Sequence, residues 1–177
     1  GYRVGVWAPN MGEWIIAALG VHRAGGVVVT VNTRFKGSEA RYVLKTAETK
    51  ILCTVTDFLD TDYVEMLGDP SEVPTLEEIV VLRGPARDDA VSWADFLARA
   101  DSIPSDVSRQ RAADVGPDDL ANILFTSGTT GNPKGAMLLH GATVRAYDAW
   151  SLVVGLQEGD RYLMINPYFH SFGLNAG

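Results

Sequence analysis

The strongest constraint on the fold is an alternation of strand-like and helix-like segments along the chain. The segment Val27-Val28-Val29-Thr30-Val31 consists of β-branched or small apolar residues, without the apolar/polar alternation of a half-exposed strand. Such a segment is typical of a strand that is buried on both faces of a parallel sheet. Further short apolar segments predict strands at residues 4–8, 51–55, 79–82, 120–125 and 161–165.

Helical patterns separate these predicted strands. Asn10 and Glu13 have the spacing of an N-cap residue and its N3 partner, and the apolar residues that follow them have helical spacing. Gly25-Gly26 ends this helix. Further helices are predicted at residues 38–49, 92–100 and 141–154, and residues 101–119 form a surface connection. The alternation predicts an α/β fold with a doubly wound, mostly parallel sheet.

Composition and charge limit the classes of function. The 177 residues are 46% hydrophobic and 21% charged, which is typical of a globular domain and not of a disordered chain. The net charge of −7 argues against a nucleic-acid partner, because proteins that bind phosphate backbones present basic surfaces. The one cysteine, Cys53, cannot form an internal disulfide, and no apolar run approaches the ~20 residues of a membrane span. We therefore expect a soluble, cytoplasmic protein without a transmembrane segment.

The most informative segment directly follows the predicted strand at residues 120–125. It reads Thr126-Ser127-Gly128-Thr129-Thr130-Gly131-Asn132-Pro133-Lys134-Gly135 and contains four hydroxyls, three glycines and one lysine. Glycines let backbone N–H groups approach an anion closely, hydroxyls add donors, and a lysine supplies a mobile positive charge. No Asp or Glu lies between Asp119 and Asp148, which lowers the repulsion that a polyphosphate would meet. We predict a phosphate-binding loop, with these binding residues: Thr126, Ser127, Gly128, Thr129, Thr130, Gly131 and Lys134.

Two common phosphate-binding motifs do not fit this loop. A Walker A loop places Gly before its Lys and Ser or Thr after it, whereas Lys134 lies between Pro133 and Gly135. The proline also lacks the N–H that a Walker loop would direct at phosphate. A dinucleotide-binding fingerprint of the form Gly-x-Gly-x-x-Gly is absent from the sequence as well.

The segment from Phe125 to Gly135 resembles the signature loop of the adenylate-forming superfamily, which includes acyl-CoA synthetases, aryl-CoA ligases, luciferases and peptide-synthetase adenylation domains. The resemblance covers the whole chain. Residues 3–10 and 24–34 resemble the early strands of the family, and Ile165-Asn-Pro-Tyr-Phe-His-Ser-Phe-Gly173 resembles the motif that lines its acyl and nucleotide pockets. Peptide-synthetase domains have an Asp after the aromatic residue, where this chain has His170 after Phe169, so the resemblance implies a carboxylic acid without an α-amino group.

The resemblance implies a fold, an activity and a set of substrates. The chain would be part of the large N-terminal domain of a bacterial fatty-acyl-CoA synthetase or a related acid–CoA ligase, including those that act on steroid-derived acids. Such enzymes use Mg²⁺ and ATP to convert a carboxylic acid to an acyl-adenylate, releasing pyrophosphate, and then pass the acyl group to coenzyme A. His170 is predicted to line the acyl side as a catalytic residue. The alternative for His170 is a histidine packed within an aromatic cluster.

The sequence leaves two other classes of function open. The loop could belong to an atypical NTPase or phosphotransferase, or the chain could be a non-catalytic nucleotide-binding module. No His/Cys spacing suits zinc, and we predict no metal ligands among the residues of the chain itself. The chain begins at Gly1 without Met and stops at Gly177, so we expect an internal fragment of a longer protein, with the adenine and ribose motifs and a C-terminal lid lying downstream.

Overall fold

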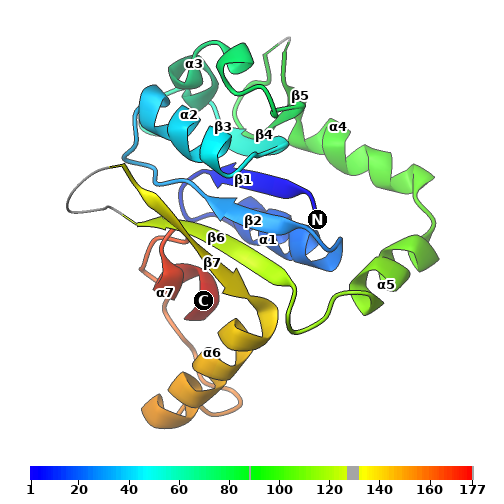
Figure 1. The fold of residues 1–177 in the computed structure, drawn as a ribbon, viewed down its shortest axis with the longest axis vertical. Coiled ribbons are helices and arrows are strands. Elements are labelled where there is room, and N and C mark those ends of the chain that lie inside the picture. Colours follow the sequence, from blue (N-terminus) through cyan, green and yellow to red (C-terminus); the bar gives the residue numbers. More distant parts are fainter. Residues whose placement is uncertain (88, 127–131, 177) are drawn as a thin grey trace.

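Seven strands form one sheet in the order β5-β4-β3-β1-β2-β6-β7 (Figure 1). The computed structural model describes residues 1–87, 89–126 and 132–176. The strands are β1 (Arg3–Trp7), β2 (Val27–Thr30), β3 (Ile51–Val55), β4 (Glu78–Arg83), β5 (Val91–Ser92), β6 (Leu120–Thr126) and β7 (Lys134–Leu139). β1 to β6 pair in parallel, and β7 pairs antiparallel with β6. The predicted mostly parallel sheet is confirmed.

Helices cover both faces of the sheet, as expected for a doubly wound fold. They are α1 (Gly12–Arg23), α2 (Gly37–Thr46), α3 (Tyr63–Leu67), α4 (Trp93–Ala98), α5 (Ser105–Ala113), α6 (His140–Val154) and α7 (Ser171–Ala176), with two 3₁₀ turns at Pro70–Glu72 and Arg99–Ser102. Neighbouring residues of a strand face opposite sides of the sheet. Val4 lines a cavity together with Ala17 of α1, whereas a Cβ added to Gly5 would lie 2.7 Å from Cδ2 of Leu44 in α2. α1 and α2 therefore pack on opposite faces.

The core lies in the central strands. All four residues of β2 are buried, in agreement with its β-branched sequence. Trp7 at the end of β1 is fully buried, stacks on Tyr63 with ring centroids 4.5 Å apart, and donates from Nε1 to the carbonyl of Asn32. Because both faces of the sheet are covered, ligands can reach it at the ends of its strands. We call these two sides the amino edge and the carboxyl edge of the sheet.

Two segments differ from the sequence pattern. The connection at residues 101–119 contains α5, and none of the nine residues of this helix is buried. An exposed polar helix lacks the apolar stripe that would reveal it in a sequence. The prediction of a strand at residues 161–165 is wrong: this segment lies outside the sheet, and four of its five residues are exposed. Strand propensity measures fit to a packed, paired surface, and no described strand pairs with this segment.

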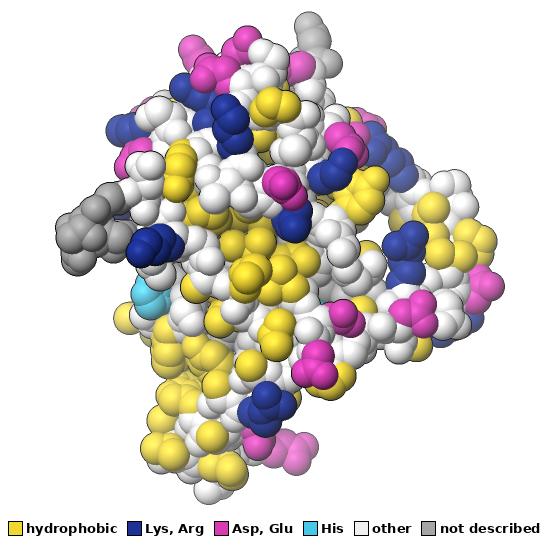
Figure 2. Space-filling model, in the orientation of Figure 1, with side chains coloured by type: hydrophobic (Ala, Val, Ile, Leu, Met, Phe, Trp, Pro, Cys, Tyr) yellow, Lys and Arg dark blue, Asp and Glu magenta, His cyan; other side chains and the backbone are white. Residues whose placement is uncertain are grey.

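The end of the molecule that carries α6 is rich in exposed apolar side chains. Figure 2 shows hydrophobic groups gathered over the part of the molecule where Figure 1 draws α6. Val144, Leu152 and Val153 of this helix are 67%, 75% and 85% exposed, and Leu163 and Ile165 of the following segment are also exposed. Among the described residues, none of the helices has the length and apolar composition needed to cross a bilayer.

Candidate functional site

The candidate site lies at the carboxyl ends of two adjacent parallel strands, β2 and β6. Their register, with Thr30 beside Leu124, brings the ends of both strands together. Open α/β sheets bind ligands at this edge, because the loops that follow the strands line a crevice there. A cavity of about 240 Å³ occupies the edge. Its lining residues are Thr30, Asn32, Phe35, Leu124, Phe125, Thr126, Phe169, His170 and Ser171.

β2 holds the His170 segment through a buried hydroxyl. Thr30 is 2% exposed, and its Oγ1 donates to the carbonyl of Phe169 over 2.9 Å. Two residues further on, the side chain of Asn32 accepts from the backbone N–H of Arg34. The end of β2 therefore supplies both a wall of the cavity and an anchor for the segment that carries His170.

Asn10 provides a second anchor for the same segment. Its Nδ2 donates to the carbonyl of Asn166 over 2.9 Å, and its Oδ1 accepts from the backbone N–H of Tyr168 over 2.8 Å. The prediction that Asn10 caps α1 is wrong, because the N-cap position is Met11 and carries no side-chain cap. The Asn10 amide instead bonds both a carbonyl and an N–H of one distant chain segment, which a pattern of local spacing cannot reveal.

His170 lies immediately before α7 at the exposed side of the cavity. Its backbone N–H donates to the carbonyl of Pro167 over 3.0 Å, and its own carbonyl accepts from the N–H of Leu174 over 2.9 Å. Nδ1 of the ring is 3.4 Å from the backbone N–H of Phe172. The ring is exposed. This exposure disfavours the alternative of a histidine packed within an aromatic cluster.

The two described ends of the Gly/Thr-rich loop are paired strand residues. Thr126 ends β6 and lies opposite Lys134, the first residue of β7, and Thr126 Oγ1 is 3.4 Å from the Lys134 carbonyl. The predicted phosphate-binding residues Ser127, Gly128, Thr129, Thr130 and Gly131 lie outside the described residues. Thr126 lines the cavity with His170, whereas Lys134 is exposed and is not among its lining residues. A strand, and not a helix, follows the loop, which is a further difference from a Walker A motif.

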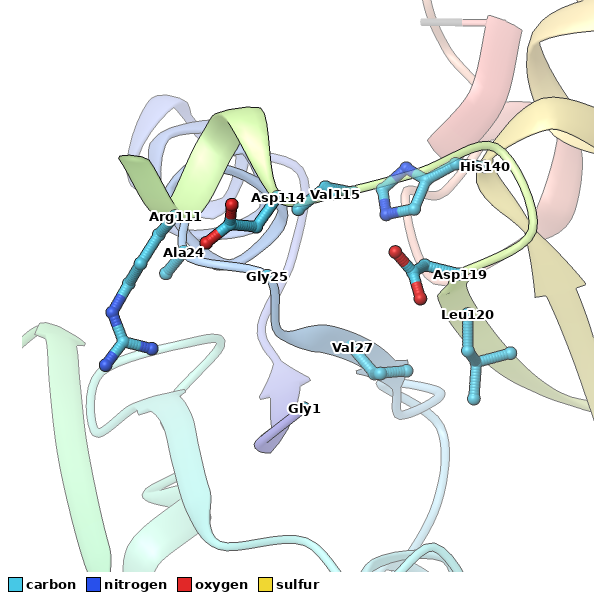
Figure 3. Close-up of a pocket in the computed structure, with 10 residues that line it drawn as sticks. All are labelled: Gly1, Ala24, Gly25, Val27, Arg111, Asp114, Val115, Asp119, Leu120 and His140. Atoms are coloured by element: carbon cyan, nitrogen blue, oxygen red, sulfur yellow. The ribbon is translucent and has the colours of Figure 1, made fainter. Parts of the chain in front are cut away.

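The opposite, amino edge of the sheet holds another cavity, of about 260 Å³ (Figure 3). Arg111 of α5 and Asp114, which directly follows α5, lie on one side of it, and Asp119 and His140 lie on the other. Partial burial and the neighbouring His22 lower the pKa of His140, against the opposing effect of Asp119. Open parallel sheets bind ligands at the carboxyl edge and not at the amino edge. The cavity lined by Thr126 and His170 is therefore the candidate site.

Comparison with known proteins identifies the family. The family model described as "AMP-binding enzyme" matches residues 1–177, the whole chain. The chain belongs to the AMP-binding enzyme family. This membership confirms the resemblance to adenylate-forming enzymes that the loop sequence indicated.

Two relatives of this AMP-binding chain bear the same name, 3-[(3aS,4S,7aS)-7a-methyl-1,5-dioxo-octahydro-1H-inden-4-yl]propanoyl:CoA ligase. The protein from Rhodococcus jostii is 41% identical over 100% of this chain and 35% of its own length. The protein from Mycobacterium tuberculosis is 39% identical over 99% of this chain and 34% of its own length. Among solved structures, the anthranilate CoA ligase AuaEII in complex with anthranoyl-AMP is similar with a TM-score of 0.78 and 26% identity, over 99% of this chain and 32% of that one. The chain spans about a third of the length of these relatives.

Sequence reasoning missed several cavity residues of this AMP-binding chain. Thr30 is the last residue of β2, Asn32 lies two residues further on, and Phe35 lies in the turn before α2. The position of Thr30 and Asn32 in the sequence could have indicated them, because parallel sheets bind ligands beside the residues at the carboxyl ends of their buried strands. Among the residues that the structure describes, no group of three or more His, Cys, Asp or Glu side chains is placed to hold a metal ion.

Proposed function

We propose that the full-length protein is an ATP-dependent acid–CoA ligase. A substrate carboxylate attacks the α-phosphorus of ATP, which forms an acyl-adenylate and releases pyrophosphate. The thiol of coenzyme A then attacks the acyl carbon and releases AMP. The observation that carries the proposal is the shared cavity, in which the start of the Gly/Thr-rich loop at Thr126 meets His170 at the carboxyl edge of the sheet. Family membership and the names of the relatives support it.

The loop from Thr126 to Lys134 is the proposed phosphate site. Ser127, Gly128, Thr129, Thr130 and Gly131 would contribute hydroxyl and backbone donors, and Lys134 would contribute a counter-charge. The antiparallel pairing of Thr126 with Lys134 supports this proposal, because it brings the two ends of the loop together at the cavity edge. Such a site needs little covalent chemistry, since in-line positioning and stabilisation of phosphate charge lower the barrier.

Mg²⁺ enters this reaction as part of the MgATP substrate, where it neutralises phosphate charge. The described residues offer hydroxyls beside the loop and no cluster of carboxylates, which suits a metal held mainly by the nucleotide. The residues of the chain then orient the phosphates at the loop and the carboxylate on the side of His170. Thr30 holds this second side in place through its hydrogen bond to Phe169.

The proposed substrate is a carboxylic acid without an α-amino group, with a propanoate carried on a fused ring system as the first candidate. The two relatives named above share this acyl group in their names, and both align with essentially the whole chain at 39–41% identity. Fatty acids are the second candidate class, because a long-chain-fatty-acid–CoA ligase of Mycobacterium tuberculosis is also similar, at 28% identity. We propose a cytoplasmic location for the reaction, where ATP and coenzyme A are available.

Product analysis of the full-length protein tests the function against its alternatives. With MgATP, coenzyme A and a panel of ring-bearing and linear acids, a ligase releases pyrophosphate and AMP only when a suitable acid is present. An NTPase or phosphotransferase would instead release inorganic phosphate or a phosphorylated product. A nucleotide-binding module would bind ATP without acid-dependent turnover. Either of these results would contradict the proposal.

A further inference from the structure

A series of partly buried side-chain hydrogen bonds joins α1 to the first turn of α7. His22 Nε2 lies 2.9 Å from Asn122 Oδ1. Asn122 Nδ2 donates to Asn175 Oδ1 over 3.4 Å, and Asn175 Nδ2 donates to the carbonyl of Ser171 over 3.0 Å. With the proton on His22 Nε2, all three bonds run in the same direction. Aligned bonds of this kind polarise and strengthen one another.

Asn122 is an unusual residue for its position in β6. Its side chain is 1% exposed, and its strand neighbours Ile123 and Leu124 are buried and apolar. A buried amide costs free energy unless its donor and acceptor are both satisfied, and an apolar residue would fill the core without that requirement. The polarity of Asn122 is therefore explained by the residues that it joins, and not by core packing.

This series of hydrogen bonds ends at the segment that carries His170, the candidate residue on the acyl side. α7 has six residues, and a helix this short depends on tertiary contacts for its position. The carbonyl of Ser171 is held twice, by Asn175 Nδ2 and by the hydroxyl of Tyr147 over 3.1 Å. Ser171 directly follows His170, and both line the cavity. A displacement of the Ser171 carbonyl would therefore change the direction of the His170 ring.

We propose that Asn122 and Asn175 are positioning residues for the acyl side of the reaction. Through the carbonyl of Ser171 they fix the first turn of α7, and through that turn they set the place of His170 in the cavity. Neither amide lines that cavity. This inference rests on the proposed function, since it predicts effects on the use of the acid.

Kinetics of Asn122→Leu and Asn175→Leu in the full-length enzyme test the proposal. Each variant is expected to lower kcat/KM for the acid roughly tenfold, because each breaks the partly buried connection to the Ser171 carbonyl, while KM for ATP stays within about twofold. The double variant is expected to lose little more than either single variant, because both substitutions break the same connection. Asn175 is only partly buried, so Asn175→Leu keeps the test available where Asn122→Leu does not fold.

Ile123→Val is the matched control for a loss of stability alone. Ile123 is buried in the same strand, faces the other side of the sheet and does not line the candidate cavity. The Ile123→Val substitution is expected to lower the melting temperature, while kcat and the KM values for the acid and for ATP are retained. Asn variants that behave like this control would overturn the positioning role. A wild-type enzyme that forms no acyl-CoA with any acid of the panel would instead remove the proposed function, and this inference with it.

Discussion

Lys134 is the residue whose charge the phosphate-site proposal depends on most directly. It is exposed at the start of β7, opposite Thr126. In the full-length enzyme, Lys134→Ala is expected to remove a charge-assisted contact worth about 1.5–3 kcal/mol, which corresponds to roughly a ten- to hundredfold rise in KM for ATP. KM for the acid should change little. Initial-rate kinetics with each substrate varied in turn provide the measurement.

Lys45→Ala is the control for the removal of one lysine charge, because Lys45 is exposed in α2 and does not line the candidate cavity. Thr129→Val and Thr130→Val test the hydroxyls separately, since valine nearly keeps the volume of threonine. The phosphate site would have to be placed elsewhere if Lys134→Ala, Thr129→Val and Thr130→Val all used MgATP as well as the wild type.

His170 is expected to affect the acid half of the reaction. Its ring is exposed beside the cavity, so His170→Ala removes a cavity wall without opening a hole in the core. We expect a higher KM for the acid or slower thioester formation, with KM for ATP and the melting temperature nearly unchanged. A destabilised variant with normal acid kinetics would show that the ring has a packing role instead.

Cys53 is expected to be chemically inert in the folded protein. It is 3% exposed, and burial, with a smaller effect of the Glu78 charge, raises the pKa of the thiol to about 12. At pH 8 the nucleophilic thiolate is therefore nearly absent. Treatment of the native enzyme with iodoacetamide at pH 8, followed by peptide mass mapping, should leave Cys53 unmodified, and the same treatment in urea should modify it. Native modification at a comparable rate would contradict the buried position.

At the scale of elements, a helix or strand could be predicted from the sequence where local residues specify it, and not where distant contacts do. β2 was predictable because its β-branched residues are buried on both faces. α5 was not predictable, because its residues are all at least partly exposed and form no apolar stripe. The absence of a strand at residues 161–165 was not predictable either, because strand formation depends on a partner strand. The composition of the loop predicts a phosphate-binding segment, and this stays a prediction. That Thr126, at the start of the loop, would line one cavity with Thr30 of β2 was not predictable, because the two residues are 96 positions apart in the sequence.

Asn10 tests the difference between a local and a distant role. Asn10→Ala is expected to free the Tyr168 amide, so hydrogen exchange measured by mass spectrometry should become roughly tenfold faster there. The first turn of α1 should exchange at its normal rate, because no side chain caps that helix. Asn10→Asp keeps the acceptor for Tyr168 N–H and is the matched control. Faster exchange confined to α1 would restore the capping role.

At the scale of the whole molecule, the candidate site is open to water. Thr126, Lys134 and His170 are all exposed, and the surface over α6 carries exposed apolar side chains. Acyl transfer to coenzyme A competes with hydrolysis of the adenylate, so an efficient ligase has to exclude water from its reacting groups. Under the proposed function, the described residues would form one side of such a site. The relatives are about three times as long as this chain. Further walls of the site would come from the region of the full-length protein that corresponds to the rest of their length.

The isolated 177-residue chain is therefore expected to show only background acid-dependent exchange of pyrophosphate into ATP, while the full-length protein exchanges strongly. Domain closure completes many sites of this kind by excluding water and bringing in the remaining catalytic groups. A circular dichroism spectrum of the isolated chain establishes that any loss is not simply unfolding. Robust exchange by the folded chain alone would show that residues 1–177 contain a complete adenylation site, and the proposed need for further walls would then be wrong.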